Sequence, residues 1–286
     1  CACLVGSEMC IRDRIILSEN RPFSMETAAC DEEYEPSSEY DSSFALQIFA
    51  AREAVFKILA KESLSIHEKL IVILDMGSKI QQCINTDEYD NIKSVVNDYL
   101  KEGIAHTLDE TRNLSDSGQF EDISLQQGIR QILYPYEEME VLNPEWEVIL
   151  KDIIDSLFEQ MSDEEYNILN EEFGTYMVSR AYEYRQLLEY FVFRYFAKSI
   201  YDYDFLGKCQ MLVTNFFVIR QMDIIRWLDN HREYSFKDRM DVVHIFSRQV
   251  EYSEDNIENL YEDFIFDDIF KTDSLIAILW IDSENI

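Results

Sequence analysis

The residues best suited to chemistry lie in one segment near the C-terminal end of the sequence. They are Asp241, His244, Arg248 and Glu251, continuing to Asp255. Steps of three and four place them on one side of a helix, opposite an apolar face. Such a stripe could line a cleft, where a histidine accepts a proton and an arginine binds a carboxylate. The same spacing is typical of the solvent face of an amphipathic helix with i,i+4 ion pairs. The residue pattern alone favours the surface interpretation.

A second candidate is the segment Tyr201-Asp202-Tyr203-Asp204, which separates two apolar helical stretches. Tyrosine and aspartate can form a hydrogen-bonded network at the mouth of a pocket. They also suit the N-cap region of a helix with partly buried rings. Both interpretations remain, and the N-cap interpretation is the better supported.

Two charged residues, Glu189 and Arg194, interrupt a run that is otherwise almost entirely apolar, residues 187–196. A buried charge costs several kcal/mol, in the range of about 3–5, unless it is paired. Each of these side chains therefore needs a partner or a wet cavity. A structural ion pair is the commoner outcome, and a binding site is the alternative.

Helical periodicity extends over most of the 286 residues, which include only 7 Gly and 4 Pro. We therefore expect an all-α protein, a multi-helix bundle with irregular up-down and orthogonal packing. Capping signals at Ser65, Asn143, Ser162, Ser235 and Ser253 mark helix starts. The expected helices cover residues 44–61, 66–80, 88–101, 123–133 (ending before Pro135), 144–161, 163 onward, 176–199, 205–228, 236–252 and 254–265.

The pattern also suggests a division of the chain. Residues 44–101 would form a helical subdomain and residues 119–286 the main helical bundle. The mostly polar stretch 102–118 between them is the expected boundary. Before them, residues 14–43 are acidic and contain a DEEYEPSSEYDSS stretch that is typical of a linker.

Residues 1–13 look foreign to the rest of the sequence. Residues 4–13, LVGSEMCIRD, read as one frame of a transposase-type sequencing adapter, so we expect the native chain to begin mid-gene near Arg14. Of the six cysteines, this leaves Cys30, Cys83 and Cys209, which are isolated from each other and from histidine. We expect no disulfide framework and no metal site, and a reducing, cytoplasmic location.

Charge narrows the range of partners. The chain carries 57 acidic and 25 basic residues, a formal net charge of −32. Nucleic-acid binding needs a basic face and is therefore not expected. A basic protein partner or a simply solvated acidic surface would fit. No apolar run approaches the length of a membrane span, so we expect no membrane partner.

Segment 244–256, HIFSRQVEYSEDN, resembles the C-terminal H-x-x-S-R-x-V-E-x-S-E-x-N segment of the flagellin lysine-N-methylase family. Weaker similarity lies in residues 190–196, 200–202 and 217–220, and in Arg14-Ile15-Ile16-Leu17-Ser18. The resemblance implies a bacterial cytoplasmic enzyme that methylates lysines of flagellin with S-adenosylmethionine. It also implies an iron–sulfur cluster held by N-terminal cysteines, and this sequence contains none of those cysteines.

The resemblance raises His244, Arg248 and Glu251 as catalytic candidates, either lining a pocket or fixing a conformation. Candidates for cofactor binding are Tyr201, Asp202, Glu189 and Arg194, and no metal ligand is expected. A lysine must lose its proton before its nitrogen attacks a methyl group, which an acidic or histidine-containing pocket would assist.

Two functional hypotheses follow. The chain is the C-terminal helical region of a protein-lysine N-methyltransferase, truncated and inactive alone. Alternatively, it is a non-catalytic acidic helical scaffold or protein-interaction module whose acidic face meets a basic partner.

Overall fold

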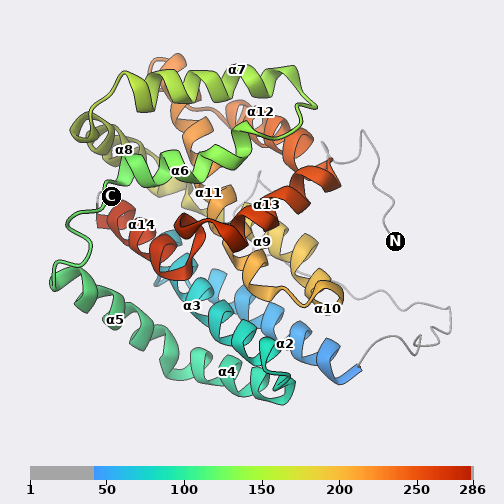
Figure 1. The fold of residues 1–286 in the computed structure, drawn as a ribbon. Helices are drawn as coiled ribbons and strands as arrows, with labels where there is room; N and C mark the ends of the chain where they lie inside the picture. Colours follow the sequence, from blue (N-terminus) through green and yellow to red (C-terminus); the bar gives the residue numbers. More distant parts are fainter. Residues whose placement is uncertain (1–41, 285–286) are drawn as a thin grey trace.

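The computed structural model describes residues 42–284, in which all regular elements are helices and no strand occurs. The adapter-like residues 1–13, the linker up to residue 41, the Arg14–Ser18 segment and Cys30 lie outside it. The expected all-α class is confirmed (Figure 1). The α-helices are α2 (Ser42–Leu59), α3 (Ile66–Asn85), α4 (Ile92–Asp98), α5 (Ile104–Asp116), α6 (Leu125–Glu137), α7 (Pro144–Ile153), α8 (Asp163–Met177), α9 (Ala181–Tyr195), α10 (Ser199–Asp202), α11 (Phe205–Asp229), α12 (Phe236–Phe246), α13 (Glu254–Phe266) and α14 (Thr272–Glu284).

Short turns of other helical types extend or join these helices. The 3₁₀ turns are η1 (Tyr89–Asn91), η4 (Val178–Arg180), η5 (Phe196–Lys198) and η7 (Asp268–Phe270). The wider π turns are η2 (Tyr99–Gly103), η3 (Ile154–Glu159) and η6 (Ser247–Glu251). A π turn has i→i+5 hydrogen bonds, so it rotates the residues that follow it relative to a regular α-helix.

Side-chain caps begin the helices where the sequence indicates. The Ser65 hydroxyl accepts a hydrogen bond from the Glu68 amide at 3.1 Å, and the Glu68 carboxylate accepts one from the Ser65 amide at 2.7 Å. Ser162 and Ser235 begin α8 and α12 with the same reciprocal arrangement. Each cap satisfies amides that have no backbone acceptor within the helix, which stabilises the fold by about 1 kcal/mol.

Several helices differ from the sequence-based expectation, among them α14, where no helix was expected. The polar stretch 102–118 contains a regular helix, α5, which packs on α3 with Leu108 buried. Helix α6 continues through Pro135 to Glu137, although this proline cannot donate the backbone hydrogen bond to the residue four positions before it. The expected helix 176–199 is divided at η4 into α8 and α9.

The longest helix, α11, is the axis of the molecule. It is buried along most of its length and packs against α3, α6, α7, α9, α12 and α13. In Figure 1, α7 and α12 lie at one end of the molecule, and α4 and α5 lie at the other.

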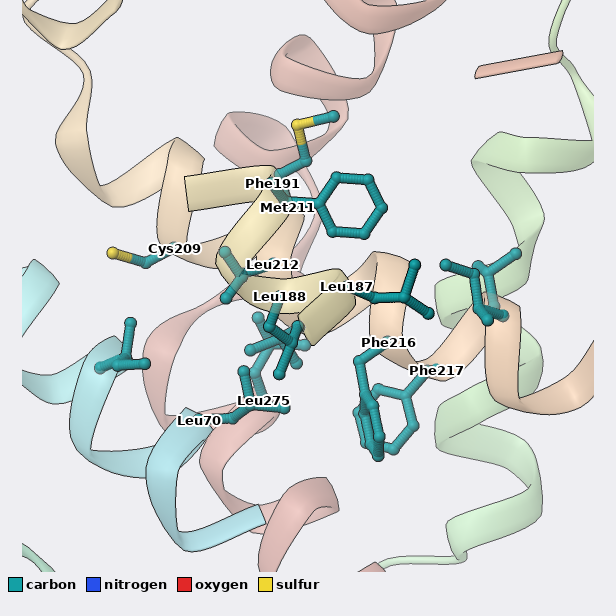
Figure 2. Close-up of a cluster of buried hydrophobic side chains, with 14 of the residues drawn as sticks. Leu70, Leu187, Leu188, Phe191, Cys209, Met211, Leu212, Phe216, Phe217 and Leu275 are labelled. Atoms are coloured by element: carbon teal, nitrogen blue, oxygen red, sulfur yellow. The ribbon is translucent and has the colours of Figure 1, made fainter. Parts of the chain in front are cut away.

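A single core joins these elements. Figure 2 shows Leu70 of α3, Leu188 of α9, Leu212 of α11 and Leu275 of α14 in one cluster, so both ends of the described chain contribute. Helices α3 and α11 approach closely at Gly77, where an added Cβ would lie 2.6 Å from the Cys209 Sγ. None of the described helices is long and apolar enough to cross a membrane.

Candidate functional site

A polar cleft opens between α7, α11 and α12 at one end of the bundle. Its volume is about 580 Å³. The apolar part of its wall comes from Val148, Ile149, Ile225 and Ile245, and the charged part comes from seven side chains. These are Glu145 and Asp152 of α7, Arg226 and Asp229 of α11, Asp241 and His244 of α12, and Arg248 of η6.

The predicted residues His244 and Arg248 therefore face a real cavity. His244 is partly buried on α12, and its pKa is lowered by burial and by the nearby Arg248 guanidinium, with Asp241 and Glu145 opposing. A lowered pKa keeps the imidazole neutral at pH 7, so its ring can accept a proton or a hydrogen bond. Four carboxylates around the same cavity suit a cationic ligand, and the two guanidinium groups suit a carboxylate or a carbonyl oxygen.

Glu251 does not line the cleft with His244 and Arg248. The chain from Ser247 to Glu251 forms the π turn η6, which breaks the spacing that an α-helix would give the stripe. Arg248 stays exposed on the cleft side, whereas the side chain of Glu251 turns into the protein and is 6% exposed. The stripe predicted from the sequence is therefore divided into two environments.

Inside the protein, Glu251 meets Arg194, another predicted residue. The Arg194 Nε lies 3.3 Å from the Glu251 carboxylate, which also accepts hydrogen bonds from Ser247 at 2.7 Å and Tyr195 at 2.9 Å. Burial raises the pKa of Glu251, and Arg194 opposes this shift. The Arg194–Glu251 contact is the structural ion pair that the sequence analysis offered as the commoner alternative.

Other residues of the 244–256 segment hold the chain that leads into α7. The Gln249 side-chain oxygen accepts hydrogen bonds from the Leu142 and Asn143 amides, at 2.9 and 3.2 Å. The Asn256 side chain bonds the amide and the carbonyl of Glu140, at 3.0 and 3.1 Å. Because α7 carries Glu145 and Asp152, these contacts fix one wall of the cleft. We call Glu251, Gln249 and Asn256, with Ser247, the buried frame.

The candidate turn at Tyr201 and Asp202 has partners within the fold. Asp202 accepts a hydrogen bond from the buried Lys208 ammonium at 2.7 Å, and Asp204 caps α11 through the Gly207 amide at 2.8 Å. Tyr203 has a left-handed backbone, φ 56°, and its ring stacks on Phe44 at 5.0 Å. The turn therefore fits the N-cap interpretation, and Tyr201 itself is exposed.

Glu189, on the same helix as Arg194, lies near a cation of another helix. It is buried on α9 near Lys69 of α3, whose pKa is lowered mainly by burial and raised in part by Glu189. The structure thus brings His244 and Arg248 together, pairs Arg194 with Glu251, and leaves Glu189 and the 201–202 turn elsewhere.

Similarity to a known protein family identifies the family of this chain. Residues 52–278 match the family model of the FliB lysine N-methylase C-terminal domain. The chain belongs to this family. No curated protein and no solved structure matches it. The matched range includes every wall of the cleft and the whole of the buried frame.

Sequence reasoning missed two charged networks buried in this FliB-family domain. In the first, the Arg239 guanidinium contacts Asp223 at 2.5 Å and Glu183 at 3.0 Å, and Asp223 accepts hydrogen bonds from Tyr184 and Tyr234. We call these five residues the Arg239 network. Asp223 and Arg239 are fully buried, and burial raises the pKa of Asp223 while Arg239 opposes the shift.

The second network, which we call the Asp282 network, joins four helices. The Asp282 carboxylate meets His67 at 2.6 Å, Arg220 at 3.3 Å and the Asn170 amide. A mostly apolar pocket of about 260 Å³ opens beside His67 and Arg220. Charges inside the apolar α11, such as Arg220 and Asp223, were the available signal in the sequence.

The described FliB-family residues do not fit an iron–sulfur cluster. Such a cluster needs about four thiolates, and the cysteines described here are Cys83 and Cys209, both buried and without a metal-binding group around them. The four cofactor candidates from the sequence line neither the cleft nor the pocket beside His67.

Proposed function

We propose that this chain serves in the methylation of flagellin lysine side chains, and that the cleft between α7, α11 and α12 receives the substrate lysine. The observation that carries the proposal is the position of His244 and Arg248. Two residues of the segment that resembles the flagellin methylases face a cavity lined by four carboxylates. Family membership supplies the class of reaction.

The charges suit the two states that a lysine passes through. Glu145, Asp152, Asp229 and Asp241 would attract and hold the ammonium form. The nitrogen must then lose a proton to become a nucleophile. His244 supports this step because its lowered pKa leaves it neutral and able to accept a proton.

The finer parts of the proposal rest on the resemblance. S-adenosylmethionine would be the methyl donor, an iron–sulfur cluster would belong to the intact protein, and the reaction would take place in the cytoplasm. The chain described here would be inactive without the part that provides these groups. The Arg194–Glu251 pair and the buried frame would position α7 and η6 rather than touch the substrate.

Flagellin binding tests the proposal without needing activity. We expect the triple variant E145Q/D152N/D229N to bind immobilised flagellin at least about tenfold more weakly than the unmodified chain, which corresponds to about 1.4 kcal/mol. The matched control is D98N/E102Q/D116N, which removes the same charge from exposed positions on α4, η2 and α5. Equal losses in the two triple variants would show that only overall charge matters, and the cleft would be rejected as the lysine site.

A second function class, the acidic interaction module, makes a different prediction. It requires flagellin or another basic partner to bind the acidic surface in general, so the control variant would weaken binding as much as the cleft variant. The cleft is favoured by one observation: His244 lines a single cavity together with four carboxylates, an arrangement that a purely electrostatic surface does not need.

A further inference from the structure

A second surface of the molecule has the features of a protein-docking site. It lies where α13 ends beside α6, and these helices pack against each other. Among the described residues, the two most exposed large apolar side chains are consecutive here, Ile265 at 75% and Phe266 at 78%. Both project from the last turn of α13, although the preceding Phe264 is buried.

A groove lies next to this turn along the chain. The groove has a volume of about 480 Å³ and begins at Asp267, the residue directly after Phe266. Its walls come from α6 and from the η7 region, and an exposed aromatic ring, that of Tyr134, lines it. The full lining is Arg130, Gln131, Tyr134, Asp267, Asp268 and Ile269.

Carboxylates surround this apolar edge and repel one another. The pKa of Asp263 is raised by partial burial and by Asp267, Glu138 and Glu262, which shows that the four groups lie close together. Two cations at this surface are engaged with other carboxylates, since Arg130 pairs with Glu137 and Lys271 pairs with Asp268. The surface therefore combines exposed apolar side chains with a group of carboxylates that repel one another.

We infer that this groove, together with Ile265 and Phe266, is the docking surface for a basic amphipathic helix of a partner protein. The apolar face of such a helix would cover Ile265, Phe266 and Tyr134, as in other helix-in-groove complexes. Its lysine or arginine residues would meet Glu138, Glu262, Asp263 and Asp267. The formal charge of −32 on the whole chain would draw this partner in over a distance. The site is separate from the cleft and does not depend on the function proposed for it.

A synthetic amphipathic helix built from lysine and leucine is a direct probe. We expect it to bind the unmodified chain, and we expect I265S/F266S to lower its affinity about tenfold. The matched control is L46S/F49S, which removes two exposed apolar side chains from α2 and should leave the affinity unchanged. A scrambled peptide of the same composition, with no apolar face, should bind no more tightly to the unmodified chain than to I265S/F266S.

Charge is tested in the same way. The variant E262Q/D263N/D267N should weaken binding of the amphipathic peptide and reduce its salt dependence, because fewer ion contacts form. The equally charged D98N/E102Q/D116N should bind as the unmodified chain does. Circular dichroism would establish that each variant is folded.

Two results would overturn the inference. Equal affinities of I265S/F266S and L46S/F49S for the peptide would mean that it binds by charge alone. Sedimentation of the unmodified chain as a dimer that I265S/F266S converts to monomer would show that a second copy, not a basic partner, covers this surface.

Discussion

The Arg239 network and the cleft are built on the same two helices, α11 and α12, yet their charges serve opposite purposes. Asp223 and Arg239 are fully buried and held in contact at 2.5 Å. Three residues further along α11 and two further along α12, Arg226 and Asp241 line an open cavity. Buried charges have no water to replace a lost partner, whereas cleft charges can exchange water for a ligand. The comparison indicates that burial, rather than residue type, distinguishes the rigid Arg239 network from the cleft, which is open to a ligand.

Removing one member of the buried pair should produce the largest effect. We expect Arg239→Met to lower the free energy of unfolding by about 3–5 kcal/mol, because Asp223 and Glu183 would be left buried without their cation. Urea denaturation measures the difference. Arg248→Met is the matched control in the cleft and should stay within about 0.5 kcal/mol of the unmodified chain. Similar losses in both variants would erase the distinction between the two regions.

Substitutions in the cleft should change the activity of the protein rather than its stability. We expect His244→Ala with Arg248→Ala to reduce methyl transfer to flagellin by the holoenzyme at least about a hundredfold, the lower range for losing a proton acceptor. The thermal midpoint of the variant should remain close to that of the unmodified protein, because both side chains face the cavity. Unchanged methyl transfer would return this stripe to the solvent-face interpretation.

The Asp282 network is a second buried network, and its contribution to the stability of the protein should depend on pH. Burial alone would raise the pKa of Asp282, but Arg220 and His67 outweigh burial and lower the pKa to about 2. The folded state thus favours the carboxylate, so the stabilisation is complete above about pH 4 and is lost as the pH falls through about 2. We expect this contribution to reach about 2 kcal/mol.

The measurement compares the free energy of unfolding of the unmodified chain with that of Asp282→Asn at several pH values. Since other carboxylates titrate in both proteins, the difference between the two isolates Asp282. This difference should shrink steadily between pH 4 and pH 2. A difference that stayed constant over that range would contradict the network as drawn.

The buried frame should give the smallest of these effects. We expect Glu251→Gln to lower the free energy of unfolding by about 1.5 kcal/mol, because the amide keeps the shape but weakens the charge-assisted contacts with Arg194 and Tyr195. Chemical denaturation checks this value. If Glu251→Gln lowered the free energy of unfolding as much as Arg239→Met does, the buried frame would be as important for stability as the Arg239 network.

Local features of the fold were readable from the sequence. The caps at Ser65, Ser162 and Ser235 depend on residues three positions apart, and the structure confirms them. The stretch after Asp204 was expected to be an apolar helix, and the structure shows it as the buried α11. The polar composition of residues 102–118 predicted a boundary instead of helix α5. The few apolar residues of α5, such as Leu108, are enough for it to pack on α3.

Contacts between distant parts of the chain could not be read in the same way. Arg194 and Glu251 were each singled out, but nothing in a single sequence pairs residues 57 positions apart. The turn at η6 was also hidden, because i→i+5 hydrogen bonds leave no spacing signature in the residue pattern. For that reason Glu251 was grouped with His244, although the fold turns the two side chains into different environments.

Helix α11, the axis of the molecule, also offers a way to monitor the stability of the protein. Its central amides are enclosed by helices from both ends of the described chain, so they have no local route to solvent. Hydrogen–deuterium exchange there can proceed only when the whole domain opens. The exchange rate of the residues around Thr214 therefore serves as a built-in gauge of global stability, against which ligand binding at either surface can be read.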